Sequence, residues 1–186
     1  MTFPIHFPKV LKDDLFIDVS EELEVGWGLT NQSSGDMGTL FWKQPENNVP
    51  LYLMAASVIK LKVMRHLRTH IRLLRIHSNG QTTGQDSVFH RDFDEDDIWT
   101  FILFGSSSWD LDWGGEFICQ DPHTLKLLYT PYIPNEGVLI PSNWWHKGCP
   151  PNGRTKHVRT SLAFSFSTEK VFEEVKNDYS FIAKFS

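Results

Sequence analysis

Three side chains beyond residue 89 have the types and spacing to hold a metal ion. His90 and Asp92 are separated by one residue, and on a β-strand such side chains point to the same face, so an imidazole and a carboxylate would emerge side by side. His146 supplies a second imidazole after an apolar run and a short turn. Two imidazoles and one carboxylate, with the remaining positions open, form the ligand set of non-haem iron(II) sites. The sequence therefore predicts a metal centre at these residues.

A fourth side chain, Arg159, opens the alternating segment Arg-Thr-Ser-Leu-Ala-Phe-Ser-Phe. Alternation would put the apolar residues on one face, suited to packing beneath a helix, and Arg159 with small residues on the other. A strand rarely points an arginine into a barrel unless the arginine meets an anion there, and a planar guanidinium matches a carboxylate bidentately. We therefore expect Arg159 to bind a dicarboxylate inside the fold, with Ser161 as a second hydrogen-bond donor to the distal carboxylate.

The ordered set of residues is far more specific than any member. Taken alone, His90 and Asp92 are better explained as a surface strand pair, because a His-x-Asp match is common by chance. The combination with His146 and an inward-pointing Arg159 favours a metal enzyme. The same residues leave two other possibilities open. One is a zinc or manganese site like those of cupin proteins, and the other is a related domain that has lost catalytic activity.

The elements that position these residues follow from the hydrophobic pattern. Residues 13–24 and 48–69 carry apolar side chains at helical spacing, with Asn48 as the expected cap of the second helix. After His70 the pattern changes to short β-like runs separated by turn formers. We expect strands at 71–77, 87–92, 98–104, 116–119, 125–133, 137–140, 144–148 and 157–167, a loop at 79–86 and a terminal helix at 169–176.

Two helices followed by many short strands, with no βαβ alternation, predict a mostly β fold with flanking helices. We expect a double-stranded β-helix (a jelly-roll or cupin-like barrel) with the N-terminal helices packed on one sheet. A length of 186 residues suits a single domain. Within it we expect helical support at 1–69, the barrel at 70–168, and a helix and tail at 169–186.

Composition and charge exclude several classes of protein. The net charge of −5 and a pI near 5.9 give no overall attraction to nucleic acid or to an anionic membrane. The N-terminus lacks the pattern of a signal peptide, and no apolar run is long enough to span a membrane. The two cysteines are expected to be reduced thiols, which fits a cytoplasmic protein. Oligomeric state cannot be predicted from these features.

The segment from about residue 70 to 168 resembles the 2-oxoglutarate/iron(II) oxygenase superfamily, specifically its prolyl 4-hydroxylase-like branch with small phage and bacterial relatives. About half of the chain carries the resemblance, and the ordered set of motifs is much more specific than any single one. These motifs are Leu-Leu-Arg-Ile-His (73–77), Phe-His-Arg-Asp (89–92), Trp-Gly-Gly-Glu-Phe (113–117), Asn-Glu-Gly-Val-Leu-Ile-Pro (135–141), Trp-His-Lys-Gly (145–148) and Val-Arg-Thr-Ser-Leu-Ala-Phe (158–164).

The resemblance implies a cofactor, co-substrates and a reaction. Iron(II) would be held by His90, Asp92 and His146, and 2-oxoglutarate would be anchored by Arg159. His77 stands where the branch usually has a tyrosine that helps to bind 2-oxoglutarate, so His77 is a candidate for the same contact. The implied reaction uses O2 to hydroxylate an aliphatic C–H of a peptidyl residue, prolyl by family precedent, or of a small molecule. It would release succinate and CO2.

Two differences from related branches of the superfamily narrow the possible substrates and reactions. The nucleic-acid demethylases of the superfamily carry a second arginine six positions after the first, where this chain has Ser165, so a nucleic-acid substrate is disfavoured. The halogenases lack the carboxylate ligand that Asp92 supplies here. Arg75, on the same strand as His77, is expected to form a salt bridge at the rim of the barrel. Trp145 is expected to pack in the core or against the metal ligands.

Two alternatives to a 2-oxoglutarate-dependent hydroxylase remain at this point. A cupin-type metal enzyme would work without 2-oxoglutarate, although such sites usually recruit a further histidine or glutamate ligand. A non-catalytic binding module on the same barrel would bind metal without forming succinate. Dependence on 2-oxoglutarate distinguishes the first alternative, and succinate release distinguishes the second.

Overall fold

The structure is a computed structural model that describes residues 3–31, 41–43 and 49–168. The described residues form two helices, one 3-10 turn and a series of mostly short strands. In chain order these are β1 (Ile5–Phe7), α1 (Asp13–Glu22), β2 (Gly28–Asn31), β3 (Phe41–Lys43), α2 (Pro50–Leu67), β4 (Ile71–Gln81), β5 (Ile98–Phe104), η1 (Leu111–Trp113), β6 (Phe117–Gln120), β7 (Leu127–Thr130), β8 (Gly137–Pro141), β9 (His146–Gly148) and β10 (Arg159–Thr168).

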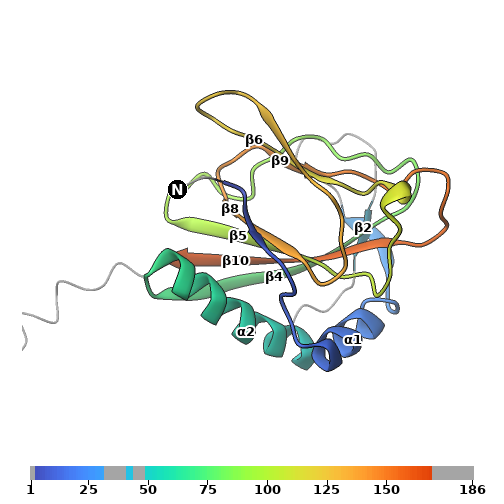
Figure 1. The fold of residues 1–186 in the computed structure, drawn as a ribbon, viewed down its shortest axis with the longest axis horizontal. Helices are drawn as coiled ribbons and strands as arrows, with labels where there is room; N and C mark the ends of the chain where they lie inside the picture. The colour runs from blue at the N-terminus through green and yellow to red at the C-terminus, as the bar shows by residue number, and fades with distance from the viewer. Residues whose placement is uncertain (1–2, 32–40, 44–48, 169–186) are drawn as a thin grey trace, which may run out of the picture.

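The strands form two sheets that face each other. The large sheet has seven strands in the order β1-β8-β5-β10-β4-β3-β2, and the small sheet has three in the order β7-β6-β9. Figure 1 shows the small sheet lying over one face of the large sheet, while α1 and α2 lie against the other face. This arrangement confirms the predicted double-stranded β-helix with helices packed on one sheet.

The alternation of β10 divides the large sheet into two buried faces. Its apolar residues Leu162, Phe164 and Phe166 pack with the helices, as the sequence pattern predicted. On α2, the buried side chains recur every three or four residues, which is the spacing of one helix face. Together these residues form the larger core cluster, in which α2 contributes Tyr52, Ala55, Ala56, Ile59 and Val63.

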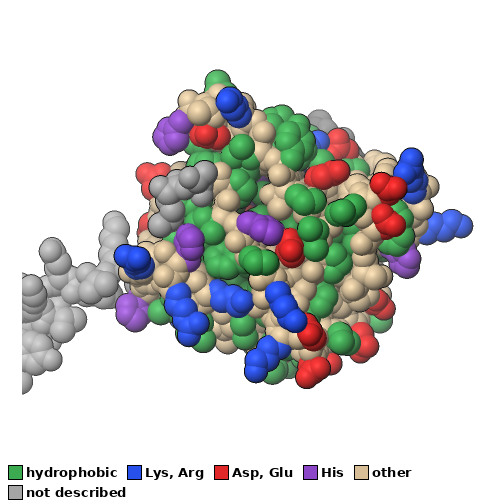
Figure 2. All heavy atoms as spheres, viewed as in Figure 1, with side chains coloured by type: hydrophobic (Ala, Val, Ile, Leu, Met, Phe, Trp, Pro, Cys, Tyr) green, Lys and Arg blue, Asp and Glu red, His purple; other side chains and the backbone are tan. Residues whose placement is uncertain are grey.

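The two helices carry opposite charge. α1 has acidic side chains and no basic ones, whereas α2 has Lys60, Lys62 and Arg65 and no acidic one. Figure 2 shows Lys and Arg side chains gathered over α2, and acidic side chains over α1 as well as elsewhere on this face. Because the helices also contact each other, their charges attract. Neither described helix is long and apolar enough to cross a membrane.

Several elements differ from the sequence prediction. The strand expected at 87–92 is wrong: this segment forms only an isolated bridge between His90 and His146. The loop expected to begin at 79 begins later, because β4 continues to Gln81 by pairing with the start of β10. α2 begins at Pro50 after an N-cap at Val49, and its expected cap Asn48 lies outside the described residues. The terminal helix expected at 169–176 also lies outside them.

The N-terminal part contributes strands as well as helices. β1 pairs with β8, and β3 pairs with both β2 and β4 at the other edge of the large sheet. These strands have three or four residues each, too few for a clear alternating pattern. Their pairing partners are distant in the sequence, so the prediction of a purely helical support missed them.

Candidate metal centre and anion site

His90, Asp92 and His146 come together as predicted. Their ligand atoms all lie within 4.8 Å of one another, the one such cluster of three metal-binding side chains among the described residues. His90 and His146 exchange backbone N–H···O hydrogen bonds of 3.0 and 2.9 Å, and the Asp92 N–H donates to the Ser142 carbonyl at 3.0 Å. These bonds hold the 87–92 segment beside β9 without a full strand ladder.

Both histidines present the same nitrogen to the cluster. Nδ1 of His90 lies 3.1 Å from the Val88 carbonyl oxygen, and Nδ1 of His146 lies 2.8 Å from the Trp144 carbonyl oxygen. A carbonyl oxygen only accepts, so each Nδ1 carries the proton and donates. The lone pair is then on Nε2, as metal ligation by a neutral imidazole requires.

Hydrogen bonds hold the two oxygens of Asp92 separately. A guanidinium nitrogen of Arg75 donates to Oδ1 at 3.2 Å, and the Thr100 hydroxyl donates to Oδ2 at 2.7 Å. Thr100 also contacts the Ser142 hydroxyl at 2.8 Å. Nε2 of His146 is 3.7 Å from Oδ2, so this oxygen faces the histidines. The salt bridge expected for Arg75 therefore exists, and its partner is a predicted metal ligand.

The protonation states suit cation binding. Burial alone would raise the pKa of Asp92, but His146, the hydrogen bond from Thr100, Arg75 and His90 outweigh it and hold that pKa below its ordinary value. Burial lowers the pKa of His146, although Asp92 partly offsets this. At neutral pH the cluster therefore holds one carboxylate and a neutral buried imidazole, the forms that bind metal.

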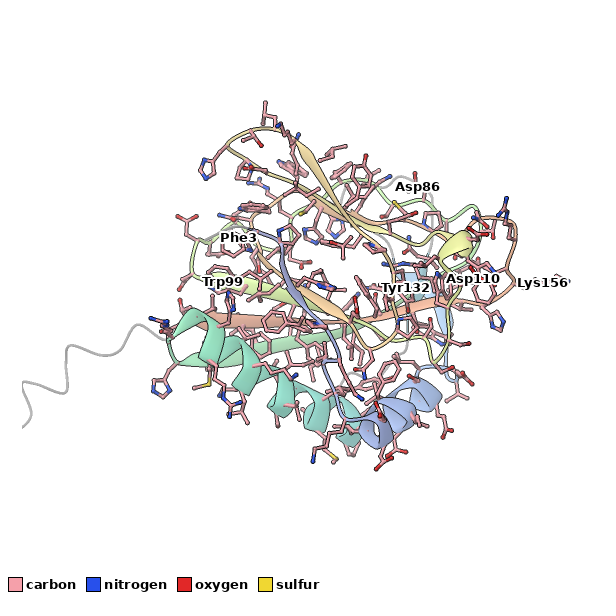
Figure 3. All side chains as sticks on the ribbon, viewed as in Figure 1. Phe3, Asp86, Trp99, Asp110, Tyr132 and Lys156 are labelled. Atoms are coloured by element: carbon pink, nitrogen blue, oxygen red, sulfur yellow. The ribbon has the colours of Figure 1, made fainter. Side chains whose placement is uncertain are left out.

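Arg159 lies inside the barrel, only 2% exposed. Its Nε donates to the Gly115 carbonyl at 2.7 Å, and one terminal nitrogen donates to Oε1 of Gln81 at 3.2 Å. The guanidinium carbon lies 4.8 Å from the centre of the Tyr132 ring, in cation–π geometry. Figure 3 shows Tyr132 between the two sheets, and its hydroxyl donates to the Thr160 carbonyl at 2.5 Å.

Two glycines make room for this arginine. A Cβ placed on Gly148 would lie 3.1 Å from one terminal nitrogen of Arg159 and 3.3 Å from the other, and 3.1 Å from the Gln81 amide oxygen. A Cβ on Gly115, where φ is +88°, would lie 3.3 Å from the Arg159 Cδ. The missing side chain at 148 leaves space beside both terminal nitrogens, on the inner face of the strand that carries His146.

The charge of Arg159 has no ionic partner in the described part of the chain. None of the ion pairs formed within residues 3–31, 41–43 and 49–168 includes it. Burial lowers the pKa of Arg159, partly offset by Tyr132, but a guanidinium remains protonated at neutral pH. A buried cation without an anion is costly, so this site favours an anionic ligand.

Ser161 and His77 lie on the same inner face as Arg159. Ser161 is buried and stands opposite Asn79 of β4, while His77 stands opposite Ala163, between the metal-ligand cluster and Arg159 along the sheet. Their contact with a co-substrate stays a prediction. Between the two ends the barrel wall is mainly apolar, formed by the smaller core cluster of Ile102, Phe104, Phe117, Cys119, Tyr132, Val138, Ile140 and Ala163.

Sequence reasoning missed Thr100, Gln81 and Gly148. Gln81 could have been found by continuing the alternation of Arg75 and His77 along β4, had the strand not been expected to end early. Gly148 follows His146 by two positions and therefore shares its face. The contact of Thr100 with Asp92 depends on the pairing of β5 with β8 and has no local signal.

One groove lies outside the barrel. It has a volume of about 230 Å³ and is lined by Phe89, Gln120, Leu127 and Trp145. The expectation that Trp145 packs in the core is wrong: it is 46% exposed, and Arg91 lies over its ring at 5.0 Å. Trp144 instead packs against the smaller core cluster. The groove is thus on the far side of β9 from the inward-pointing His146.

Comparison with known proteins places the fold. No family model and no curated protein matches the chain. Among solved structures, a prolyl hydroxylase from Trichoplax adhaerens in complex with a hypoxia inducible factor oxygen degradation domain peptide fragment superposes with a TM-score of 0.67 at 12% identity, covering 89% of this chain and 84% of the other.

Two further structures give the same result. A Pseudomonas putida prolyl-4-hydroxylase has a TM-score of 0.64 at 17% identity, covering 89% of this chain and 92% of the other. HygX from Streptomyces hygroscopicus, with nickel, 2-oxoglutarate and hygromycin B bound, has a TM-score of 0.64 at 12% identity, covering 91% and 84%. The chain therefore has the fold of these three proteins over nearly its whole length.

Proposed function

We propose that this chain is a non-haem iron(II) oxygenase of the prolyl 4-hydroxylase-like branch, with 2-oxoglutarate and O2 as co-substrates. The observation that carries the proposal is the buried charge of Arg159, which takes part in no ion pair among the described residues, in the barrel that also holds the His90, Asp92 and His146 cluster. A short dicarboxylate fits both features, because one end would chelate the metal and the other would meet the guanidinium.

The residues present fit an iron(II) ion. Two imidazoles whose Nδ1 atoms donate to backbone carbonyls, leaving Nε2 for a metal, and one ionised carboxylate match the donor set of mononuclear iron oxygenases and leave positions for further ligands. The residues also fit 2-oxoglutarate, because Gly148 leaves beside Arg159 a space that a Cβ would fill. Ser161 and His77 lie on the same inner face and are proposed to contact this co-substrate.

The bound iron would supply activation of O2, coupled to decarboxylation of 2-oxoglutarate to succinate and CO2 and to hydroxylation of a substrate C–H bond. The protein's part is to bind and orient. His90, Asp92 and His146 hold the metal, and Arg159 fixes the distal carboxylate and so sets the direction of the co-substrate. The apolar wall around Phe117 and Val138 would exclude water from the space between the metal ligands and Arg159.

The substrate is proposed to be a peptidyl residue or a small molecule with an aliphatic C–H. Both kinds occur among the neighbours by fold: one was solved with a peptide fragment and another with hygromycin B. We further propose that the chain works as one oxygenase domain, with N-terminal support from about residues 1–69, a barrel at about 70–168 and a C-terminal helix and tail at 169–186.

Two alternatives are separated from this proposal by simple measurements. A cupin-type metal enzyme would turn over without 2-oxoglutarate, and a binding module would hold metal without producing succinate. The unpaired Arg159 favours a 2-oxoglutarate-dependent enzyme over the cupin-type enzyme, which supplies no anion for it, while succinate release separates the enzyme from the binding module.

The deciding experiment is anaerobic reconstitution with iron(II) and 2-oxoglutarate, followed by addition of O2. We expect a weak visible metal-to-ligand charge-transfer band, then slow succinate formation even without substrate. The Arg159→Met variant should bind iron(II) normally and show the band only at much higher 2-oxoglutarate concentration. A folded, iron-loaded wild-type protein that forms neither band nor succinate would rule the proposal out.

A further inference from the structure

We propose that Arg75 is a positioning residue that keeps Asp92 a one-oxygen metal ligand and so preserves an open coordination position. The inference rests on the proposed function, since it concerns how the chain's own residues would hold iron(II). It follows from the unequal partners of the two carboxylate oxygens of Asp92.

Each oxygen of Asp92 has a distinct direction. Oδ2 receives the Thr100 hydroxyl at 2.7 Å and lies 3.7 Å from Nε2 of His146, so it faces the ligand cluster. Oδ1 receives a terminal nitrogen of Arg75 at 3.2 Å, which turns it toward β4. A metal between the histidines would therefore meet Oδ2, while Oδ1 is held by a charge-assisted hydrogen bond.

Arg75 is itself held in place. Its guanidinium carbon lies 5.2 Å from the centre of the Phe93 ring, in cation–π geometry. It stands opposite Ser165 of β10, whose buried hydroxyl has no hydrogen-bond partner among the described residues. The side chain of Arg75 thus forms its hydrogen bond with Asp92 and not with the neighbouring strand β10.

The consequence concerns the number of open positions. Two histidines and a one-oxygen carboxylate occupy three of six octahedral positions, which leaves about three for other ligands. A 2-oxo acid bound through two atoms and one O2 need all three. If both oxygens of Asp92 bound the metal, one of these positions would be lost. Arg75 guards against that outcome by occupying Oδ1.

Manganese(II) provides a direct test, because the relaxation of water protons reports how many waters the bound ion carries. We would compare the wild type with Arg75→Ala, Arg75→Lys and, as a matched control, Arg72→Ala. Arg72 lies on the same strand, points to the same face and is exposed, and no ion pair of the described residues includes it. The manganese(II) dissociation constant and the thermal midpoint would be measured on the same samples.

We expect Arg75→Ala to lower the relaxivity per bound manganese by about a third, as one of three waters is displaced. The manganese(II) dissociation constant should rise by roughly tenfold or more, as when other hydrogen-bond partners of metal ligands are lost. Arg75→Lys should restore much of the wild-type value, and Arg72→Ala should match the wild type. Unchanged relaxivity and affinity in a folded Arg75→Ala protein would overturn the inference. A wild type that binds no metal would instead overturn the proposed function, and the inference with it.

Discussion

The two ends of the barrel differ in how their charges are balanced. At one end Asp92 is paired with Arg75, hydrogen-bonded to Thr100 and close to His146, so its charge is compensated before any ligand arrives. At the other end Arg159 is buried, its hydrogen bonds go to two neutral groups, the Gly115 carbonyl and the Gln81 amide, and no ion pair among the described residues includes it. The first end groups ligand atoms that could hold a cation. The second is a charge that an anionic ligand would complete.

The largest expected effect is on metal binding. Replacing His146 or Asp92 by alanine removes one of three ligands, so the metal dissociation constant should rise by more than the roughly 100-fold typical of losing a supporting residue. The binding of iron(II) or manganese(II) can be followed by equilibrium dialysis. His123→Ala is the control, since this histidine is exposed and outside the cluster. Equal metal affinity in the wild type and in Asp92→Ala would contradict the assignment of Asp92 as a metal ligand.

A glycine substitution should separate the two ends. In Gly148→Ala the new Cβ would lie 3.1 Å from Arg159 and from Gln81, so the 2-oxoglutarate dissociation constant should rise at least about tenfold while metal affinity changes little. Calorimetric titration of the metal-free protein with iron(II) measures the metal constant, and titration of the iron(II) form with 2-oxoglutarate measures the other. Gly153→Ala is the matched control, because nothing lies within 4 Å of its Cβ position. Loss of metal affinity alone in Gly148→Ala would contradict the division into two sites.

The pH dependence of stability should come from the metal end. Burial lowers the pKa of His146 in the folded state, so between that pKa and the unfolded value near 6.5 the unfolded chain binds more protons. The free energy of unfolding of the metal-free protein should therefore fall as pH drops below about 6.5, by up to about 1.4 kcal/mol per pH unit from this group.

Urea unfolding from pH 7 to 5 would measure that slope. His146→Gln should have a flatter slope than the wild type, whereas Arg159→Met should keep the wild-type slope because Arg159 does not titrate there. The lowered pKa of Asp92 acts in a separate window, since its contribution is present above the ordinary carboxyl value and lost only in stronger acid. A wild-type slope in His146→Gln would argue against this assignment.

The smallest expected effect uses one cysteine at each end as a probe. Burial raises the pKa of the Cys119 thiol, which pairs with His146 in the sheets, to about 12, so it should resist alkylation at pH 8. Burial also raises the pKa of Cys149, but Lys147 and Arg159 partly offset it. When 2-oxoglutarate neutralises Arg159, alkylation of Cys149 by iodoacetamide should slow roughly two- to fivefold. If the metal alone slows the alkylation of Cys149 and 2-oxoglutarate adds nothing, the anion would bind away from Arg159.

Much of the fold could be predicted because its signals are local. β5 was predicted with its observed bounds, and α2 was predicted as a helix. Its buried face was not: the apolar spacing included Met54 and Leu61, which are exposed, whereas α2 buries Tyr52, Ala55, Ala56, Ile59 and Val63. The strand at 87–92 was wrong because its ordering depends on a single bridge to His146 and on bonds to Ser142, which local composition does not reveal. β1 was missed for the same reason, since its partner β8 lies far along the chain.

The candidate site was predicted by residue type more than by environment. His90, Asp92 and His146 have rare ligand chemistry in an ordered pattern, and Arg159 violates the rule that inward strand positions are uncharged. Thr100 and Gly148 have ordinary local roles, a β-branched strand residue and a strand-end glycine. Only the pairing of strands brings Thr100 to Asp92 and Gly148 to Arg159.

The loose attachment of the 87–92 segment has a further consequence. Its backbone is joined to the barrel near the ligands by the two bonds between His90 and His146 and by two N–H groups that donate to Ser142. Such a segment can open locally at a small cost, so its amide protons should exchange with solvent sooner than those of β10. The free energy of metal binding would then include the cost of closing the 87–92 segment. Because only the closed segment binds the ion, the ion that binds most tightly would also suppress the opening most strongly.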